Sequence, residues 1–441
     1  MKRRFVRRAS YLAFLVASSL AGAELCAPLV MSALRGDPAS RQALRQELFG
    51  SAAYRSRDAV AGGTQTPGWM AQHVLHPYYG FARNPEIERQ IFNQRVIDEP
   101  VNRYGFFGAL DEGASGDFRV VVAGGSLAAE LYLYGGGRLR ERLDGSGALP
   151  GERKATLASV ALGGFKQPQQ LLALTYLLAV GERYDVVINL DGFNEGVLPF
   201  AENAPLGVFP WYPRSWRLYA AGSVARESTV LLGEIAYLRD QTETWKRSLF
   251  QSPLRHSYLA LAVLRTRVAR QENRIRQLDG ELRAVLAGRT AAFRETGPPY
   301  SYEDDGRLFA DSASLWKRTS QQMWSACRSR GVRYLHFLQP NQYVAGSKVF
   351  TADETRTAFL PPDHRYRRGV ERSFPLLRAA GEELAAEGVP FTDLTRLFLD
   401  EPRTVYRDHC CHLNQLGYDR LADAIADAIL AQLRSDPEQP P

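Results

Sequence analysis

The sequence predicts an α/β fold with a mostly parallel sheet, an inserted antiparallel helical hairpin and an apolar segment at the N-terminus. Three strand–turn–helix units follow one another within residues 111–214, and such repetition is typical of parallel strands joined by right-handed crossovers. From residue 215 to residue 290 the strand pattern gives way to heptad-spaced apolar residues. A basic N-terminus followed by an apolar run indicates that the rest of the chain is exported.

The N-terminus carries most of the excess charge of the chain. The formal net charge is +7, and five lysine and arginine residues lie within the first eight positions, so the remaining residues are nearly balanced. No sustained basic stripe is left, which argues against binding of nucleic acid. Residues 9–34 are largely apolar apart from Glu24, and this length is sufficient to cross a bilayer.

We therefore expect residues 1–34 to form an uncleaved signal anchor, a single span of the inner membrane with the bulk of the chain in the periplasm. The short basic end would stay in the cytoplasm, because lysine and arginine flank the cytoplasmic ends of such helices. The alternative is a signal peptide with Ala21-Gly22-Ala23 as its cleavage site, which would release the chain from the membrane.

Residues 35–110 are expected to form a juxtamembrane helix and linker, followed by loops that cover one face of the sheet. Residues 76–84 and 102–108 combine aromatic side chains with the turn-forming residues Gly, Pro and Asn. This composition predicts ordered loops rather than strands or helices.

The first part of the core, residues 111–214, places glycine-rich or polar turns directly after its strands. These strands are expected at residues 120–123, 156–162 and 185–190. The first leads into Gly-Gly-Ser126, the second into Gly-Gly164-Phe, and the third into Gly-Phe-Asn194-Glu. Because open α/β sheets bind ligands at the carboxyl ends of their strands, the sequence predicts a site at this edge.

Residues 215–290 are predicted to form a long helical hairpin inserted into the core. Apolar residues recur every seven positions in both halves, namely Val224, Leu231, Leu238 and Trp245, then Leu261, Val268, Ile275 and Leu282. Between them, Ser252-Pro253 combines a favourable N-cap with proline at the first helical position. The hairpin would either cap the site or hold a protein partner.

Residues 291–433 are predicted to complete the core, and residues 434–441 to form a disordered tail. Strands are expected at 332–338 and 389–392, with a mobile loop over about 345–368 and a helix over 370–387 between them. A closing helix carries a single apolar face, formed by Leu421, Ile425, Ile429 and Leu433.

The chain has four cysteines, which is too few for a disulfide framework. Cys410 and Cys411 are neighbours, and Cys327 is distant from them in the sequence. One bridge from Cys327 to either neighbour is compatible with this arrangement, and so is burial of all three as small apolar side chains.

Four local patterns occur in order along the chain: Gly-Gly-Ser126, Gly-Gly164-Phe, Gly-Phe-Asn194-Glu, and Asp408 followed by His412-Leu-Asn. Their order and form resemble the SGNH (GDSL-type) hydrolase superfamily, and more narrowly its exported bacterial members with an N-terminal anchor. The resemblance covers about residues 76–200 and 330–433 and leaves out the helical hairpin. It implies a flavodoxin-like three-layer sandwich around the parallel sheet.

The resemblance also implies a role for each matched residue. Ser126 would be the nucleophile and His412 the general base that takes its proton. The oxyanion of the tetrahedral intermediate would be bound by the backbone N–H groups of Ser126 and Gly164 and by the side-chain amide of Asn194. Asn194 is also explained as a turn-capping residue, the usual role of an asparagine after a glycine turn.

The sequence departs from the family pattern at the acid that orients the histidine. The pattern has aspartate three residues before the histidine, but His409 holds that position and Asp408 lies four residues before His412. Asp408 reaches the imidazole only if the loop bulges. Otherwise His412 pairs with a backbone carbonyl, or His409 takes a role. A glycine also replaces the aspartate of Gly-Asp-Ser, as in the anchored members.

The resemblance, together with the expected export, implies an extracytoplasmic serine esterase or acyltransferase that acts on a small acyl ester or an acylated carbohydrate, with O-acetyl groups of an envelope carbohydrate as the expected target. Neither a cofactor nor a metal is expected. The alternative is a catalytically silent scaffold or binding protein of the envelope that keeps the fold and uses the helical hairpin to hold a partner. Lipid-ester hydrolysis is a third option, and it needs an apolar acyl groove.

Overall fold

The computed structural model describes residues 22, 24, 26, 41–49, 72–87, 90–92, 95–108, 117–222, 226–288, 293–302 and 304–435. The chain divides into two compact units. The first comprises Met1–Gln72, Arg89–Asp98 and Val224–Arg289, and the second comprises His73–Glu88, Glu99–Ser223 and Thr290–Pro441.

The second unit contains a sheet of five strands in the order β6-β5-β7-β8-β9, and every neighbouring pair is parallel. The strands are β5 (Phe118–Gly124), β6 (Ala155–Ala161), β7 (Val186–Asp191), β8 (Arg333–Leu338) and β9 (Phe391–Asp393). The predicted α/β fold with a mostly parallel sheet is confirmed. The strand order places β5 between β6 and β7, so the turns that follow these three strands share one edge of the sheet.

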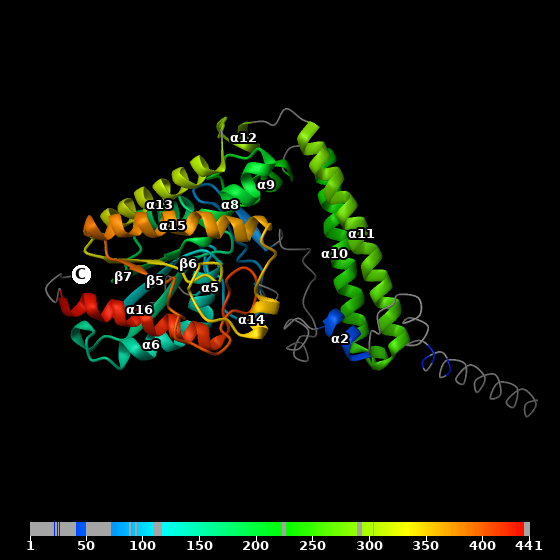
Figure 1. Ribbon diagram of the computed structural model, residues 1–441, viewed down its shortest axis with the longest axis horizontal. Helices are drawn as coiled ribbons and strands as arrows, with labels where there is room; N and C mark the ends of the chain where they lie inside the picture. Colours follow the sequence, from blue (N-terminus) through cyan, green and yellow to red (C-terminus); the bar gives the residue numbers. More distant parts are fainter. Residues whose placement is uncertain are drawn as a thin grey trace, which may run out of the picture. The chain divides into compact units, whose positions relative to one another are not determined.

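Helices cover both faces of the sheet (Figure 1). Helices α13 (Asp305–Arg328) and α15 (Arg365–Ala386) lie on one face, and α6 (Gly136–Asp144) and α16 (Gln415–Ser435) lie on the other. Strand β7 is consequently buried at all six positions. The apolar face expected for the closing helix is buried in α16, at Leu421, Ile425, Ile429 and Leu433. Burial on both faces explains the continuous apolar run of β7, and burial of one face explains the apolar face of α16.

Shorter helices connect these layers. They are α5 (Ser126–Glu130), α7 (Gln169–Ala179), α8 (Phe193–Leu198), α9 (Trp216–Gly222), α12 (Phe293–Thr296) and α14 (Ala352–Thr357). Turns of π type continue both α5, over Leu131–Gly135, and α8, over Pro199–Asn203. Such turns occur frequently at functional sites.

Two segments expected to be loops contain regular structure. Residues 76–84 lie largely in an antiparallel pair, β1 (His73–His76) with β2 (Gly80–Arg83). The stretch expected to be a mobile loop contains α14, and buried Lys348 and Glu354 hold it in place. The carboxylate of Glu354 accepts hydrogen bonds from the backbone N–H groups of Val405 at 2.9 Å and Tyr406 at 3.1 Å. Polar contacts of this kind leave no signature in local sequence pattern.

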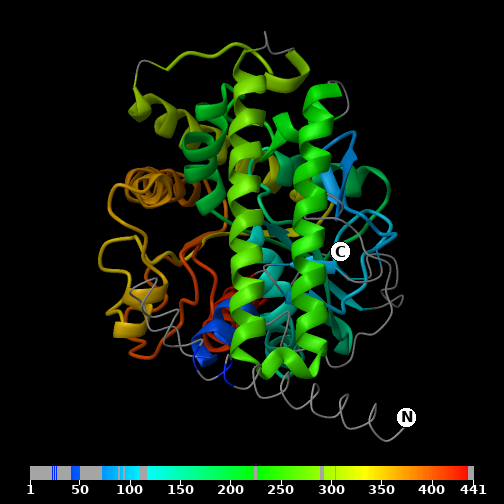
Figure 2. The same ribbon diagram turned by 90° about the vertical axis from the view of Figure 1, so that its right-hand side faces the viewer.

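The first unit contains the helical hairpin and a second short antiparallel pair, β3 (Gln90–Phe92) with β4 (Arg95–Ile97). Helices α10 (Arg226–Gln251) and α11 (Tyr258–Gly288) run side by side (Figure 2) and are joined by a short turn at Pro253–His256. Ser252 caps this turn as expected, because its hydroxyl accepts from the N–H of Leu254 at 3.0 Å.

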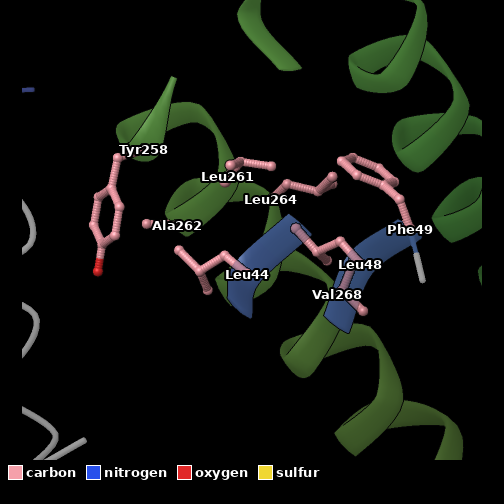
Figure 3. Close-up of a cluster of buried hydrophobic side chains, with 8 residues drawn as sticks. All are labelled: Leu44, Leu48, Phe49, Tyr258, Leu261, Ala262, Leu264 and Val268. Atoms are coloured by element: carbon pink, nitrogen blue, oxygen red, sulfur yellow. The ribbon is translucent and has the colours of Figure 1, made fainter. Parts of the chain in front are cut away.

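Helix α2 (Arg41–Phe49) packs against the hairpin through an apolar cluster (Figure 3). Leu44 and Leu48 of α2 lie against Leu261, Leu264 and Val268 of α11. The seven-residue spacing seen in the sequence therefore serves helix–helix packing within this unit.

The predicted anchor, residues 9–34, lies outside the described residues except for positions 22, 24 and 26. Glu24 accepts hydrogen bonds at the start of α11, from the Ser257 hydroxyl at 2.9 Å and the Leu259 N–H at 3.1 Å. Within the described ranges, no helix is both long and apolar enough to cross a membrane. Of the predicted tail, Arg434 and Ser435 end α16, and positions 436–441 lie outside the described residues.

Candidate active site

Ser126 lies at the carboxyl end of β5, where two glycines let the chain turn sharply beside β7. Gly124 has φ +149°, and a Cβ at this position would lie 2.1 Å from the carbonyl oxygen of Leu190. A Cβ at Gly125 would lie 2.2 Å from Nδ2 of Asn194. The Gly-Gly pair therefore brings Ser126, the first residue of α5, next to Asn194, and it leaves the Ser126 side chain half-buried.

His412 lies within hydrogen-bonding distance of both Ser126 and Asp408. The Nε2 atom of His412 is 2.9 Å from Oγ of Ser126, although the two residues are 286 positions apart in the sequence. Its Nδ1 atom is 2.8 Å from Oδ2 of Asp408. The structure thus brings together a hydroxyl, an imidazole and a carboxylate in the order required for proton transfer from the serine.

A bulge in the loop allows Asp408 to reach His412 across four residues. Cys411 has φ +70°, one of two positive φ values among non-glycine residues of the described chain. The N–H of Arg407 donates to the carbonyl of His412 at 3.0 Å and closes the loop. The side chain of Asp408 also accepts from the N–H of Cys410 at 2.8 Å. The acid that pairs with His412 is therefore Asp408, and His409 is exposed to solvent.

The surroundings of Asp408 favour its ionised form. Burial by itself would raise the pKa of this carboxyl group, but the hydrogen bond and charge of His412, the N–H of Cys410 and the nearby charge of Arg407 lower the pKa to about 2. Asp408 is therefore a carboxylate at neutral pH and stabilises positive charge on the imidazole of His412.

Arg407 joins the loop of Asp408 to the helix of Ser126. Its guanidinium donates to the fully buried carboxylate of Glu130, and its Nε is 3.7 Å from Oδ2 of Asp408. Glu130 follows Ser126 by four residues, so both lie on the same side of the helix. The hydroxyl of Tyr418 also donates to Glu130. This pair is absent from the expectations drawn from the sequence, although the four-residue spacing from Ser126 to Glu130 is a usable signal.

Gly164 and Asn194 lie around the same corner of the sheet edge. Gly164 has φ +84°, which glycine adopts without strain. Nδ2 of Asn194 donates to the carbonyl of Phe165 at 2.6 Å, and this bond orients the amide beside Gly125. Among the described residues, the backbone N–H groups of Ser126 and Gly164 donate to no acceptor. These groups are therefore free to bind an oxyanion.

Glu195 connects the Asn194 helix to the Gly164 turn. Its Oε2 accepts from the N–H of Gly192 at 2.8 Å, and its Oε1 accepts from Nε2 of Gln170 at 2.8 Å and the N–H of Gln167 at 3.2 Å. Burial, followed by the charge of Asp191, raises the pKa of Glu195 well above its ordinary value. Glu195 has no role among the expectations drawn from the sequence. A carboxylate in the first turn after a glycine cap is nevertheless typical of a residue that accepts from the N–H of the cap.

A second serine–histidine–aspartate array lies inside the protein. His336 Nε2 is 2.9 Å from Oδ1 of Asp191, and its Nδ1 is 2.8 Å from Oγ of Ser320. The exposed fractions of Ser320, His336 and Asp191 are 0, 0 and 2%, so substrate cannot reach this array. Trp316 also donates to Asp191 at 2.6 Å. We interpret the array as a buried polar network that supports β7 and β8.

The cysteines near His412 are poor nucleophiles. Burial raises the pKa of Cys410 to about 12 and that of Cys411 well above its ordinary value. Both are free thiols, as is the fully buried Cys327, so the bridge considered from the sequence is not formed. Cys411 instead accepts a hydrogen bond from Gln339 at 3.0 Å. The serine hydroxyl, 2.9 Å from Nε2, is therefore the better candidate for a nucleophile beside His412.

Comparisons with protein families and with curated proteins found no match. Within the part of the chain that the structure describes, no group of three or more histidine, cysteine, aspartate and glutamate residues is arranged to hold a metal ion. The geometry around Ser126 is consequently the basis on which a function can be assigned.

Proposed function

We propose that this protein is a serine esterase or acyltransferase in which Ser126 forms an acyl-enzyme intermediate. The observation that carries the proposal is the continuous chain of contacts from Ser126 Oγ through His412 to Asp408, with distances of 2.9 and 2.8 Å. A hydroxyl with an oriented base on one side and free N–H donors beside it is suited to acyl transfer.

In the acylation step, His412 Nε2 takes the proton of Ser126 as Oγ attacks the ester carbonyl. The negative charge on the former carbonyl oxygen is bound by the N–H groups of Ser126 and Gly164 and by the amide of Asn194. His412 then gives the proton to the departing alcohol, while Asp408 stabilises the imidazolium. Because the pKa of Asp408 is about 2, this carboxylate remains ionised throughout the step.

In the second step, His412 activates an incoming hydroxyl, which attacks the acyl group on Ser126. Water in this position gives an esterase, and a sugar hydroxyl gives an acyltransferase. The export-type N-terminus supports an extracytoplasmic location, where O-acetyl groups of an envelope carbohydrate would be accessible as the substrate. This substrate class also follows from the resemblance to SGNH hydrolases.

The release of p-nitrophenol from p-nitrophenyl acetate tests the proposal. We expect measurable turnover by the wild type and loss of turnover in Ser126→Ala. Loss of the nucleophile of a serine triad costs on the order of 10⁶ in rate. Equal turnover by the wild type and Ser126→Ala would contradict the enzymatic function and favour the silent scaffold.

The second array provides a matched control. Ser320 also contacts a histidine paired with aspartate, but it is fully buried. A fluorophosphonate probe should label the peptide that contains Ser126 and leave the peptide that contains Ser320 unlabelled. Labelling should persist in folded Ser320→Ala and disappear in Ser126→Ala.

A further inference from the structure

A cluster of three polar side chains lies beside the proposed oxyanion site. Glu202 accepts two hydrogen bonds from the guanidinium of Arg214, from Nε at 2.9 Å and from Nη2 at 2.7 Å. The hydroxyl of Tyr366 also donates to Glu202 and lies 3.3 Å from Nη2 of Arg214. These contacts hold the guanidinium in one orientation from two sides.

Arg214 is close to both sides of the site. A Cβ at Gly164 would lie 2.7 Å from Cδ of Arg214, so the arginine stem packs directly on the turn that supplies an oxyanion N–H. The guanidinium also lies near the thiol of Cys410, two residues before His412. The guanidinium therefore lies at the rim of the Ser126 site, between the Gly164 turn and the His412 loop.

The backbone next to Arg214 is strained. Ser215 has φ +58°, and with Cys411 it is one of the two non-glycine residues of the described chain that have positive φ. Such conformations are unfavourable for residues with a side chain and concentrate at binding and catalytic sites. The Cys411 strain positions His412, and we interpret the strain at Ser215 in the same way, as the cost of directing Arg214 towards the site.

The guanidinium retains free hydrogen-bonding capacity on one side. Its Nη1 atom, with two N–H donors, has no acceptor among the residues that the structure describes, and 42% of the side chain is exposed. Glu202 balances the positive charge of Arg214, and buried Lys166 adds only part of a charge at neutral pH, because burial lowers its pKa to about 7. The neighbouring Glu195 adds little negative charge, because burial raises its pKa. The rim thus offers oriented N–H donors that no described residue occupies.

We propose that Arg214 binds a carboxylate of the substrate, so that the ester is carried by an acidic saccharide rather than a neutral one. The Nη1 donors would bind the carboxylate while the neighbouring acyl ester lies at Ser126. Arginine is suited to this role, because its planar donors match carboxylate geometry. This proposal rests on the esterase or acyltransferase function and defines its substrate class.

The test compares acetate release from O-acetylated polygalacturonate and from the same polymer after methyl esterification of its carboxylates. We expect wild-type protein to prefer the acidic polymer in kcat/KM. In Arg214→Gln the ratio of acidic to neutral kcat/KM should fall on the order of 10–100-fold, the range of a charge-assisted hydrogen bond. Arg214→Lys keeps the positive charge but loses the planar set of N–H donors of the guanidinium. It should therefore give an intermediate ratio of acidic to neutral kcat/KM.

A control variant and a measurement on unmodified protein separate recognition from folding. Arg142 is paired with Asp427 on another face and has a similar exposure of 37%, so Arg142→Gln should keep the wild-type ratio. With the wild type alone, unacetylated polygalacturonate should inhibit p-nitrophenyl acetate hydrolysis competitively, and its methyl ester should not.

Several outcomes overturn the assignment of Arg214. The first is that the ratio of acidic to neutral kcat/KM is equal in the wild type and in Arg214→Gln. The second is that the wild type does not prefer the acidic polymer, and the third is that it releases acetate from neither polymer. In each case p-nitrophenyl acetate turnover that depends on Ser126 leaves the esterase function intact. Turnover that persists in Ser126→Ala removes the function as well, so the two failures are distinguishable.

Discussion

Arg407 pairs with Glu130, and this buried contact connects the loop that carries the proposed base to the helix that begins with the proposed nucleophile. The two residues are 277 positions apart in the sequence. Glu130 is fully buried, and the side chain of Arg407 is 18% exposed. The relative positions of Ser126 and His412 therefore depend on a charge pair that is not itself part of the proposed reaction.

Replacement of Glu130 by glutamine is expected to lower both stability and kcat. Loss of Glu130 leaves Arg407 with only its longer contact to Asp408, and loss of one partner of a buried pair costs up to about 3–5 kcal/mol. The double variant Glu130→Leu with Arg407→Met should lose less stability than Glu130→Gln, because it removes both charges. Urea unfolding measures these differences. A double variant that is less stable than the single variant contradicts the buried-pair interpretation.

Replacement of Asp408 by asparagine should reduce kcat by roughly 10⁴-fold in a protein that still folds at neutral pH, because the histidine loses its oriented, charged partner. The low pKa of Asp408 also predicts a pH effect. A depressed carboxyl pKa contributes stability above its ordinary value, 3.8, which is lost as pH falls towards about 2. The free energy of unfolding of the wild type minus that of Asp408→Asn should therefore decrease as the pH falls through this window. A constant difference would contradict the assigned pKa.

Gly125→Ala should reduce activity through Asn194. The new Cβ would lie 2.2 Å from Nδ2 of Asn194 and displace the amide from the oxyanion site. Loss of one oxyanion donor costs about 10²–10³-fold in kcat. Asn194→Ala should show the same loss, and the double variant should be little worse than either single one. Gly137→Ala is the control, since no atom lies within 4 Å of its added Cβ, and alanine in helix α6 should stabilise by about 1 kcal/mol.

Lys166→Met should change the pH dependence of stability. Burial lowers the pKa of Lys166 to about 7, from an ordinary value of 10.5. Between these values the unfolded chain binds a proton that the folded protein does not, so stability of the wild type rises with pH. The free energy of unfolding of Lys166→Met minus that of the wild type should therefore decrease as pH rises through this range. Parallel curves for the two proteins would show that Lys166 is not desolvated in the folded state.

Much of the fold could be predicted because its signals are local. Strands β5 and β7 contain short apolar runs, since a parallel strand with both faces covered is apolar along most of its length. The turns after them could be recognised by Gly and Asn. By contrast, the helix at Ala352–Thr357 was expected to be part of a loop, because its stability depends on contacts of Glu354 with Val405 and Tyr406.

The sequence by itself determined which residue types stand at the ends of the strands, because strand, turn and helix each follow from neighbouring residues. Only the tertiary structure decided that Asp408 rather than His409 or a backbone carbonyl faces His412, because the bulge depends on the φ angle of Cys411. It also decided the pairing of Arg407 with Glu130 and the orientation of Arg214. These contacts join residues far apart in the chain, and burial and charge at such contacts depend on how the whole core packs.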